Sequence, residues 1–218
     1  MASTIYVVHR ENQREAILEV AEDLFIQKGI EPVTMGEIAD AARLTRATIY
    51  KYFSNKEEIA QEIFKTITKA WRDRNERDVW GFQGTGYQRL ERFLNCFFLN
   101  LFQNPREASF VGEFNYLYAK KWSADVFVET MLQNLVEDRQ FIFGCFEQGL
   151  QDGSVRTDMD ANMGTAVFFN FISGMVSRIG EMGGKVEQEF GIGAQVIFTQ
   201  IWRIYLDGLK ASSTLPKA

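Results

Sequence analysis

The feature that most constrains the fold is a set of helix start signals in the first quarter of the sequence. A hydroxyl or amide side chain followed three residues later by Glu can cap a helix N-terminus reciprocally. The capping pairs are Asn12 with Glu15, Thr34 with Glu37 and Ser54 with Glu57, and Thr45 caps a further helix. Apolar residues at helical spacing follow each signal, and Gly29 is a natural stop for the first helix. The segment therefore predicts three short helices leading into a long fourth one.

A helix-turn-helix occupies the middle of this segment. Residues 41–45 form the predicted turn, and residues 46–53 form the following helix. One side of that helix carries hydroxyl, basic and phenolic groups, whereas Ile49 and Phe53 lie on the other. A short helix of this kind can enter a DNA major groove while its apolar side anchors it to a small core. Any three packed short helices give a similar pattern, so the charge distribution also matters.

The charge distribution is local. The chain has a net charge of −5, which argues against a protein that coats nucleic acid indiscriminately. Between Arg43 and Lys56, however, there are four basic residues and no acidic one. A basic stripe beside an acidic remainder favours phosphate contacts along one edge of the protein.

The rest of the chain also predicts helices. We expect them from Thr85, from Pro105 in the first helical position, over about 123–150, over about 161–180 and over about 189–210. No strand-like alternation of any length is present, so the predicted fold is all-α. We expect a helix-turn-helix domain at 1–56, a helical effector-binding and dimerisation domain at 57–211 and a disordered tail at 212–218.

Catalytic and metal-binding chemistry is poorly supported. The one histidine, His9, lies in an N-terminal arm that we expect to be flexible, which excludes His-dependent triads and most zinc sites. Cys96 and Cys145 lack metal-ligand spacing and read as buried free thiols. No apolar run is long enough to cross a bilayer. We therefore expect a cytoplasmic protein that is not an enzyme and has no metal, no cofactor, no catalytic residue and no membrane partner.

The sequence resembles the TetR (tetracycline-repressor-like) family of bacterial transcription regulators. The likeness lies in residues 17–29, 34–42 and 45–59, where Tyr50, Phe53, Lys56 and Glu57 form a specific pattern. A weaker echo is Glu147-Gln148-Gly149, then Gly153, Arg156-Thr157-Asp158 and Gly174. Tyr52 departs from the family, which often has His there, and this could alter a phosphate contact. Strong similarity covers about the first quarter of the chain.

The resemblance implies a homodimer whose two third helices enter successive major grooves of a palindromic operator. One short helix reads too few base pairs by itself, so geometry also favours a dimer. Arg46 and Lys51 would reach guanine edges or phosphates. For Tyr50, packing inside the small core is an equal alternative to DNA contact. The expected DNA-binding residues are Thr34, Thr45, Arg46, Thr48, Tyr50, Lys51, Tyr52 and Lys56.

The resemblance further implies an effector pocket between the long fourth helix and the body. An aromatic lining would favour a small apolar or aromatic effector, although plain core packing is the favoured alternative for each ring taken singly. Glu113, Asn115 and Asn170 are candidate polar anchors. The expected effector-binding residues are Trp71, Phe97, Phe98, Phe110, Phe114, Tyr118, Trp122, Phe168 and Phe171.

The last two helices are expected to form the dimer interface, with burial inside one subunit as the alternative. The residues expected there are Phe168, Ile172, Met175, Ile197, Ile201, Ile204 and Tyr205. The predicted function is a ligand-responsive repressor. Two rivals remain: a helical enzyme or small-molecule-binding protein without DNA binding, and a DNA-binding scaffold with a closed core and no effector.

Overall fold

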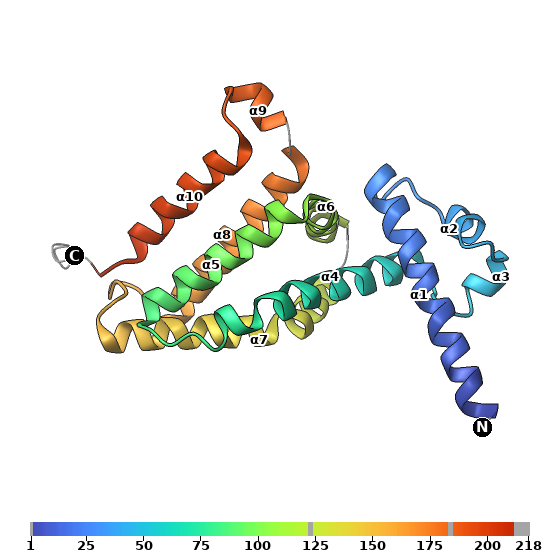
Figure 1. The fold of residues 1–218 in the computed structure, drawn as a ribbon, viewed down its shortest axis with the longest axis horizontal. Helices are drawn as coiled ribbons and strands as arrows, with labels where there is room; N and C mark the ends of the chain where they lie inside the picture. The colour runs from blue at the N-terminus through green and yellow to red at the C-terminus, as the bar shows by residue number, and fades with distance from the viewer. Residues whose placement is uncertain (1, 122–123, 183–184, 212–218) are drawn as a thin grey trace. The chain divides into compact units, whose positions relative to one another are not determined.

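The protein is described by a computed structural model over residues 2–121, 124–182 and 185–211. Within these ranges the regular elements are all α-helices, and the β-type pairing is one isolated bridge between Val155 and Lys210. The predicted all-α class is confirmed. The predicted tail at 212–218 lies outside the described residues. The helices, labelled in Figure 1, are α1 (Ala2–Lys28), α2 (Met35–Ala41), α3 (Arg46–Ile49), α4 (Lys56–Val79), α5 (Gly86–Gln103), α6 (Pro105–Lys121), α7 (Ala124–Asp152), α8 (Ala161–Met182), α9 (Lys185–Phe190) and α10 (Ala194–Leu209).

The chain folds as two compact units, Met1–Thr68 and Lys69–Ala218. In the first unit, α2 packs against both α1 and α3. The buried core of this unit draws on all four of its helical segments and on the loop that follows α1. Its fully or almost fully buried residues include Ile17, Ala21, Phe25, Ile30, Val33, Ile38, Ala39, Ile49, Phe53, Ile59 and Ala60.

Two of the predicted caps in the first unit are confirmed. Thr34 and Glu37 form the reciprocal capping box at the start of α2. The Thr45 hydroxyl accepts the Thr48 N–H at the start of α3. Gly29 ends α1 with a φ of 88°, a left-handed conformation that glycine adopts without steric cost.

Two other predicted starts are wrong. Asn12 lies inside α1, which already begins at Ala2, so His9 also belongs to this helix rather than to a flexible arm. The sequence before Asn12 contains no Pro or Gly, and one Asn inside a helix costs only a few tenths of a kcal/mol, about 0.7 at most. At α4 the cap is Asn55 rather than Ser54, because Asn55 Oδ1 accepts the Glu58 N–H while Glu58 accepts the Ser54 N–H.

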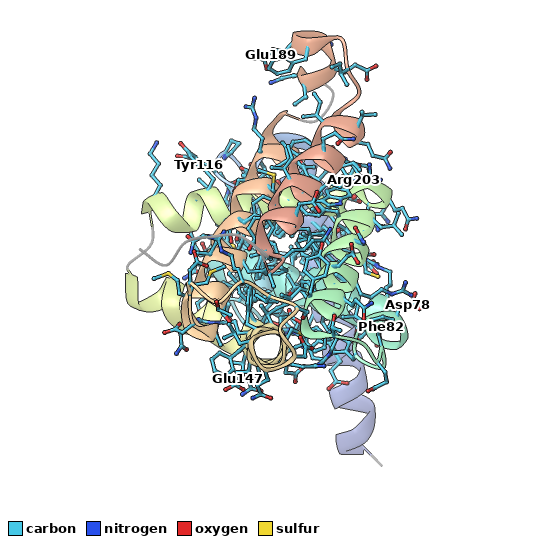
Figure 2. The ribbon with its side chains drawn as sticks, turned by 90° about the vertical axis from the view of Figure 1, so that its left-hand side faces the viewer. Asp78, Phe82, Tyr116, Glu147, Glu189 and Arg203 are labelled. Atoms are coloured by element: carbon cyan, nitrogen blue, oxygen red, sulfur yellow. The ribbon has the colours of Figure 1, made fainter. Side chains whose placement is uncertain are left out.

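The second unit is a bundle in which α5 packs on α7, and α8 packs on α6 and α7. Figure 2 shows side chains gathered between these helices, while the exposed Tyr116 and Glu147 point outward. Thr85 and Gln88 form the cap of α5, and Pro105 is the first residue of α6, as predicted. An alanine Cβ at Gly86 would come within 2.2 Å of the Gly149 nitrogen, so α5 and α7 nearly touch there.

The last predicted helix, 189–210, is interrupted. The structure has the short α9, then Gly191 with a φ of 65°, and then α10, which starts after Gly193. Two glycines flanking Ile192 remove the steric bias toward a helix, which explains the break. At the other end of α10, Lys210 pairs with Val155, and Arg156 donates to the Gly208 carbonyl and to Asp158. The Arg156 and Asp158 of the family-like echo therefore help to fasten the end of α10 to the turn after α7.

Candidate DNA-binding surface and effector region

The helix α3 is held from behind and exposed in front. Ile49 is fully buried and Phe53 is 1% exposed, so both anchor the segment in the core of the first unit. Backbone hydrogen bonds continue the helical turn from Arg46 to Phe53, although the regular helix ends at Ile49. Arg46, Tyr50 and Lys51 are exposed on the other side. Tyr50 is 54% exposed, which excludes the alternative that it packs inside the core.

A shallow groove of about 480 Å³ lies beside α3. Residues at the start of α2 form one wall, and residues 54–57 at the start of α4 form the other. The groove brings together four of the predicted DNA-binding residues, Thr34, Arg46, Tyr50 and Lys56. Helix N-termini attract anions through unpaired N–H groups and the helix dipole, so such a groove suits phosphate oxygens.

Glycine 36 shapes this groove, and the sequence reasoning missed it. The Arg46 guanidinium lies directly over Gly36, where an alanine Cβ would come within 2.6 Å of Nη2. The absence of a side chain lets the arginine lie along the groove. Met35, Ser54 and Asn55 also line it without having been predicted. The signal that could have found them is their position at the first residues of two capped helices.

Several predicted DNA-binding residues already have partners within the protein. The Lys56 ammonium donates to the carbonyls of Ile30, Glu31 and Val33, which ties the start of α4 to the loop after α1. The Tyr52 hydroxyl donates to Gln13 on α1. The hydroxyls of Thr45 and Thr48 hydrogen-bond one another at 2.8 Å. The more weakly engaged groups are therefore those of Arg46, Tyr50 and Lys51.

The Glu37 carboxylate on α2 is held by groups of α1 and of its own helix cap. Hydrogen bonds from Lys28 and from the backbone and side chain of Thr34 lower the pKa of Glu37 to about 2. Its negative charge is held by Lys28 and by the helix cap rather than by α3. The Glu37 charge is therefore satisfied within α1 and α2, whereas Glu57 at the start of α4 lines the groove together with Arg46.

The predicted effector-binding rings fall into three groups. Phe98, Phe110, Phe114 and Phe168 are at most 1% exposed and pack as core. Phe97 and Phe171 are half-buried: Phe97 meets Trp71 edge to face, and Phe171 stacks on Tyr205 with ring centroids 4.0 Å apart. Trp122 and the Tyr118 side chain lie outside the described part of the structure.

Polar groups meet at the junction of α4, α5 and α6. Glu107 accepts hydrogen bonds from Trp71 Nε1 and from Arg74 Nη2, the latter at 2.7 Å. Arg74 Nε donates to Asn100 Oδ1 at 3.1 Å. Asn100 is 4% exposed, and its Nδ2 has no hydrogen-bond partner. Sequence reasoning named Trp71 but missed the other three, because their spacing in the chain gives no hint that they meet.

A second polar contact fastens α4 to α7. Arg72 donates to Asp138 through Nε at 3.2 Å and to Glu137 through Nη1 at 2.7 Å. Burial raises the pKa of Asp138, and the hydrogen bond from Arg72 opposes that shift. The body end of α4 is thus held by charged groups on two sides. Of the candidate anchors, Glu113 is half-buried, Asn170 donates to the Ala166 carbonyl of its own helix, and Asn115 has a buried, unpartnered Oδ1.

The predicted dimer residues are divided between core and surface. Phe168 and Ile172 are buried within the subunit, and Tyr205 stacks on Phe171. Met175, Ile197 and Ile201 are partly exposed, and Ile204 is 72% exposed. On these two helices, three further exposed apolar residues were not predicted: Met163 and Val167 on α8, and Val196 on α10. Hydrophobic periodicity finds an apolar stripe but cannot say which of two apolar stripes faces outward.

Two further findings concern other kinds of site. Among the described residues, no three His, Cys, Asp or Glu side chains lie close enough to hold a metal ion. No helix in the described part of the chain combines the length and the apolar character needed to span a membrane.

Comparison with known proteins agrees with this architecture. The family model "Bacterial regulatory proteins, tetR family" matches residues 17–63, which cover the helix-turn-helix and the start of α4. The chain is 27% identical over 156 residues to the uncharacterized HTH-type transcriptional regulator YdeS of Bacillus subtilis, covering 69% of this chain and 71% of YdeS. It is 24% identical over 212 residues to the repressor KstR2 of Rhodococcus jostii, covering 92% of each.

Solved structures share the fold along nearly the whole chain. FadR of Bacillus subtilis, crystallised with stearoyl-CoA, superposes with a TM-score of 0.68 at 18% identity, covering 89% of this chain and 98% of FadR. The ketosteroid regulator KstR2 of Mycobacterium tuberculosis superposes with a TM-score of 0.62 at 21% identity, covering 91% and 95%. The helix-turn-helix therefore belongs to the TetR family of bacterial regulatory proteins, and the helical body shares its fold with these regulators.

Proposed function

We propose that this protein is a cytoplasmic, dimeric repressor that a small apolar or aromatic effector releases from a palindromic operator. The observation that carries the DNA-binding part is the exposed set Arg46, Tyr50 and Lys51 beside a groove between two helix N-termini. Residues 1–56 are the proposed DNA-binding domain and residues 57–211 the effector-binding and dimerisation domain. In this proposal the chain has no catalytic role.

In the first unit, some residues contact DNA directly and others hold the reading helix in place. Arg46 and Lys51 reach base edges or phosphates, and the Tyr50 hydroxyl contacts a phosphate. Thr34 and Lys56 contribute the N-termini of α2 and α4, because their side chains already serve inside the protein. Thr45, Thr48 and Tyr52 hold the shape of α3 and contact the backbone of the duplex at its edges.

Dimerisation supplies the second reading helix. An operator fixes its half-sites about one helical turn apart, or a multiple of that, so two copies of α3 must be held at a set distance. The exposed apolar residues of α8 and α10, Met163, Val167, Val196 and Ile204, are the proposed interface. Phe168, Ile172 and Tyr205 support it from within the subunit.

The effector acts through α4. This helix starts beside the groove at Lys56 and ends at Val79 in the body, where Trp71, Arg72 and Arg74 hold it to α6 and α7. An effector bound among the half-buried rings would loosen these ties and change the separation of the two reading helices. Two structurally similar proteins favour an apolar ligand, because FadR was crystallised with stearoyl-CoA and KstR2 is a ketosteroid regulator.

The DNA-binding proposal is tested by selecting bound fragments from random DNA and measuring affinity by mobility shift. Arg46→Ala and Lys51→Ala should each weaken operator binding at least tenfold and leave the melting temperature within about 1 °C, because both side chains are exposed. Arg139→Ala, which removes an exposed arginine from α7, is the matched control and should bind normally. Affinity should also fall steeply with salt.

Two outcomes would support the rival functions. If the protein binds no duplex, or its affinity does not depend on salt, it is a helical small-molecule-binding protein or enzyme. If it binds an operator but no apolar compound raises its melting temperature, it is a scaffold without an effector.

A further inference from the structure

The junction of α4, α5 and α6 contains a buried hydrogen-bond donor that the protein itself leaves unused. Asn100 Nδ2 has no partner although the residue is 4% exposed. Its orientation is fixed, because Oδ1 of the same amide accepts from Arg74 Nε at 3.1 Å. Native proteins rarely leave a buried donor without an acceptor, since water is lost and nothing replaces it. A ligand oxygen is the natural partner for such a group.

The same place already holds a carboxylate. Glu107 accepts from Trp71 Nε1 and from Arg74 Nη2, and its side chain is 24% exposed. Three donor groups on two helices therefore meet at this junction: the indole N–H of Trp71, the guanidinium of Arg74 and the amide of Asn100. Donors of this kind suit an oxyanion. Glu107 also lies in the first turn of α6, where the helix dipole favours negative charge.

Apolar rings adjoin these donors on one side. Phe97 meets Trp71 edge to face with centroids 5.8 Å apart, and Phe93 stacks on Phe97 at 6.2 Å. Both Phe rings are half-buried. An anionic group at the donors would therefore have an aromatic row beside it for an attached apolar part.

We propose that Trp71, Arg74 and Asn100 bind the oxyanion of an amphipathic effector, a carboxylate or a phosphate, and that Glu107 occupies its place until the effector displaces it. This inference rests on the proposed effector response. A neutral ligand that displaced Glu107 would leave Arg74 without a counter-charge, whereas an anionic one restores it. Because Glu107 is partly exposed, its carboxylate can move into water. Its departure frees α6 from Trp71 and Arg74, which are two of the ties on α4.

The binding experiment uses the full protein without DNA. The probes are straight-chain alkyl carboxylates of 8, 12 and 16 carbons, the matching alkyl phosphates and the matching alcohols. Calorimetry should show at least a tenfold preference for one anionic series over the alcohols of equal length. The two anionic arms distinguish a carboxylate from a phosphate head group. Equal affinity for anions and alcohols, or no binding of any probe, would overturn the inference.

Variants test the assigned donors. Asn100→Leu and Asn100→Asp should lose the anion preference while alcohol affinity changes less than twofold. Glu107→Gln should bind the anion at least fivefold more tightly, because the competing charge is gone. Circular dichroism melting confirms that each variant folds. Anion affinity that is unchanged in both Asn100 variants would refute the site.

A direct signal comes from the indole N–H groups. The chain has four tryptophans, so a nitrogen-15 spectrum shows four indole resonances, and Trp71→Phe identifies one of them. Anions should shift the Trp71 resonance, and alcohols should not, because only an anion replaces its acceptor. A separate mobility-shift assay tests the proposed function. If anions bind at this site but operator affinity does not change, the site is supported and the proposal that an effector releases the operator is rejected.

Discussion

At the scale of single residues, Arg43 is the most unusual position in the helix-turn-helix. It has a φ of 55°, the one left-handed non-glycine conformation among the described residues. The Leu44 N–H donates to the Ala39 carbonyl, and the Arg43 N–H donates to the Asp40 carbonyl. These two bonds form the Schellman motif that ends α2, with an arginine where glycine is usual. The position therefore stores backbone strain in the turn between α2 and α3.

Arg43→Gly should stabilise the protein by about 1 kcal/mol, because glycine adopts this conformation without the penalty of a side chain. Urea unfolding would measure the change. Arg43→Ala is the matched control: it removes the same charge but keeps a Cβ, so its stability should stay close to that of the original protein. A gain of equal size in both variants would show that charge, and not backbone strain, is responsible.

At the scale of elements, close backbone approaches and capping groups decide how the helices meet. An alanine Cβ at Gly86 would contact the Gly149 nitrogen and the Cys145 carbonyl, which are backbone atoms of α7 that cannot move aside. The Asp152 carboxylate also accepts the Gly86 N–H, and Ser154 accepts the Tyr87 N–H. In the first unit, Glu37 joins α1 to α2 by accepting from Lys28 on one helix while it caps the other.

Gly86→Ala should destabilise the second unit by about 3 kcal/mol, since α5 and α7 must move apart. Gly144→Ala, on the same helix α7, meets nothing within 4 Å and should be neutral or stabilising by up to about 1 kcal/mol. Thermal unfolding of both variants checks the difference. Equal effects would contradict the close approach.

Stability in acid should depend on Glu37. Its hydrogen bonds to Lys28 and Thr34 lower its pKa from 4.5 to about 2. A lowered pKa stabilises the folded protein above pH 4.5 and ceases to do so as the pH falls toward 2. The melting temperature of the original protein minus that of Glu37→Gln should therefore decrease as the pH is lowered from 4.5 toward 2. A constant difference between the two proteins would mean that the carboxylate contributes no pH-dependent stability.

At the scale of the whole molecule, regulation requires that effector binding changes the free energy of operator binding. The helix α4 is continuous from Lys56 to Val79 and is fixed by Lys56 at one end and by Arg72 and Arg74 at the other. A ligand changes operator affinity only insofar as it binds the two states of the protein differently. Thermodynamic linkage then makes the effect reciprocal.

A compound that weakens operator binding by some factor should itself bind more weakly, by the same factor, when the operator is present. Calorimetry of the compound against free protein and against the protein–operator complex measures both quantities. If its affinity is the same in the two titrations while the operator is still released, release does not proceed through a coupled change in the protein.

Local sequence signals account for many of the helix boundaries in this protein. The caps at Thr34, Thr45 and Thr85, the stop at Gly29 and the start at Pro105 are local, because each is made by atoms a few residues apart. The same is true of the exposed basic side of α3, which follows from the burial of Ile49 and Phe53. Local signals misled where two capping residues stood side by side, as at Ser54 and Asn55, or where no breaker preceded Asn12.

The tertiary structure decided what depends on distant parts of the chain. It placed Gly36 under Arg46, gave the Lys56 side chain three carbonyl partners and joined Trp71, Arg74, Asn100 and Glu107 into one cluster. It also separated the outward residues of α8 and α10 from the inward ones, which periodicity alone could not do. The physical reason is that capping is encoded over one helical turn, whereas a binding site is made by side chains whose neighbours are chosen only when the helices pack.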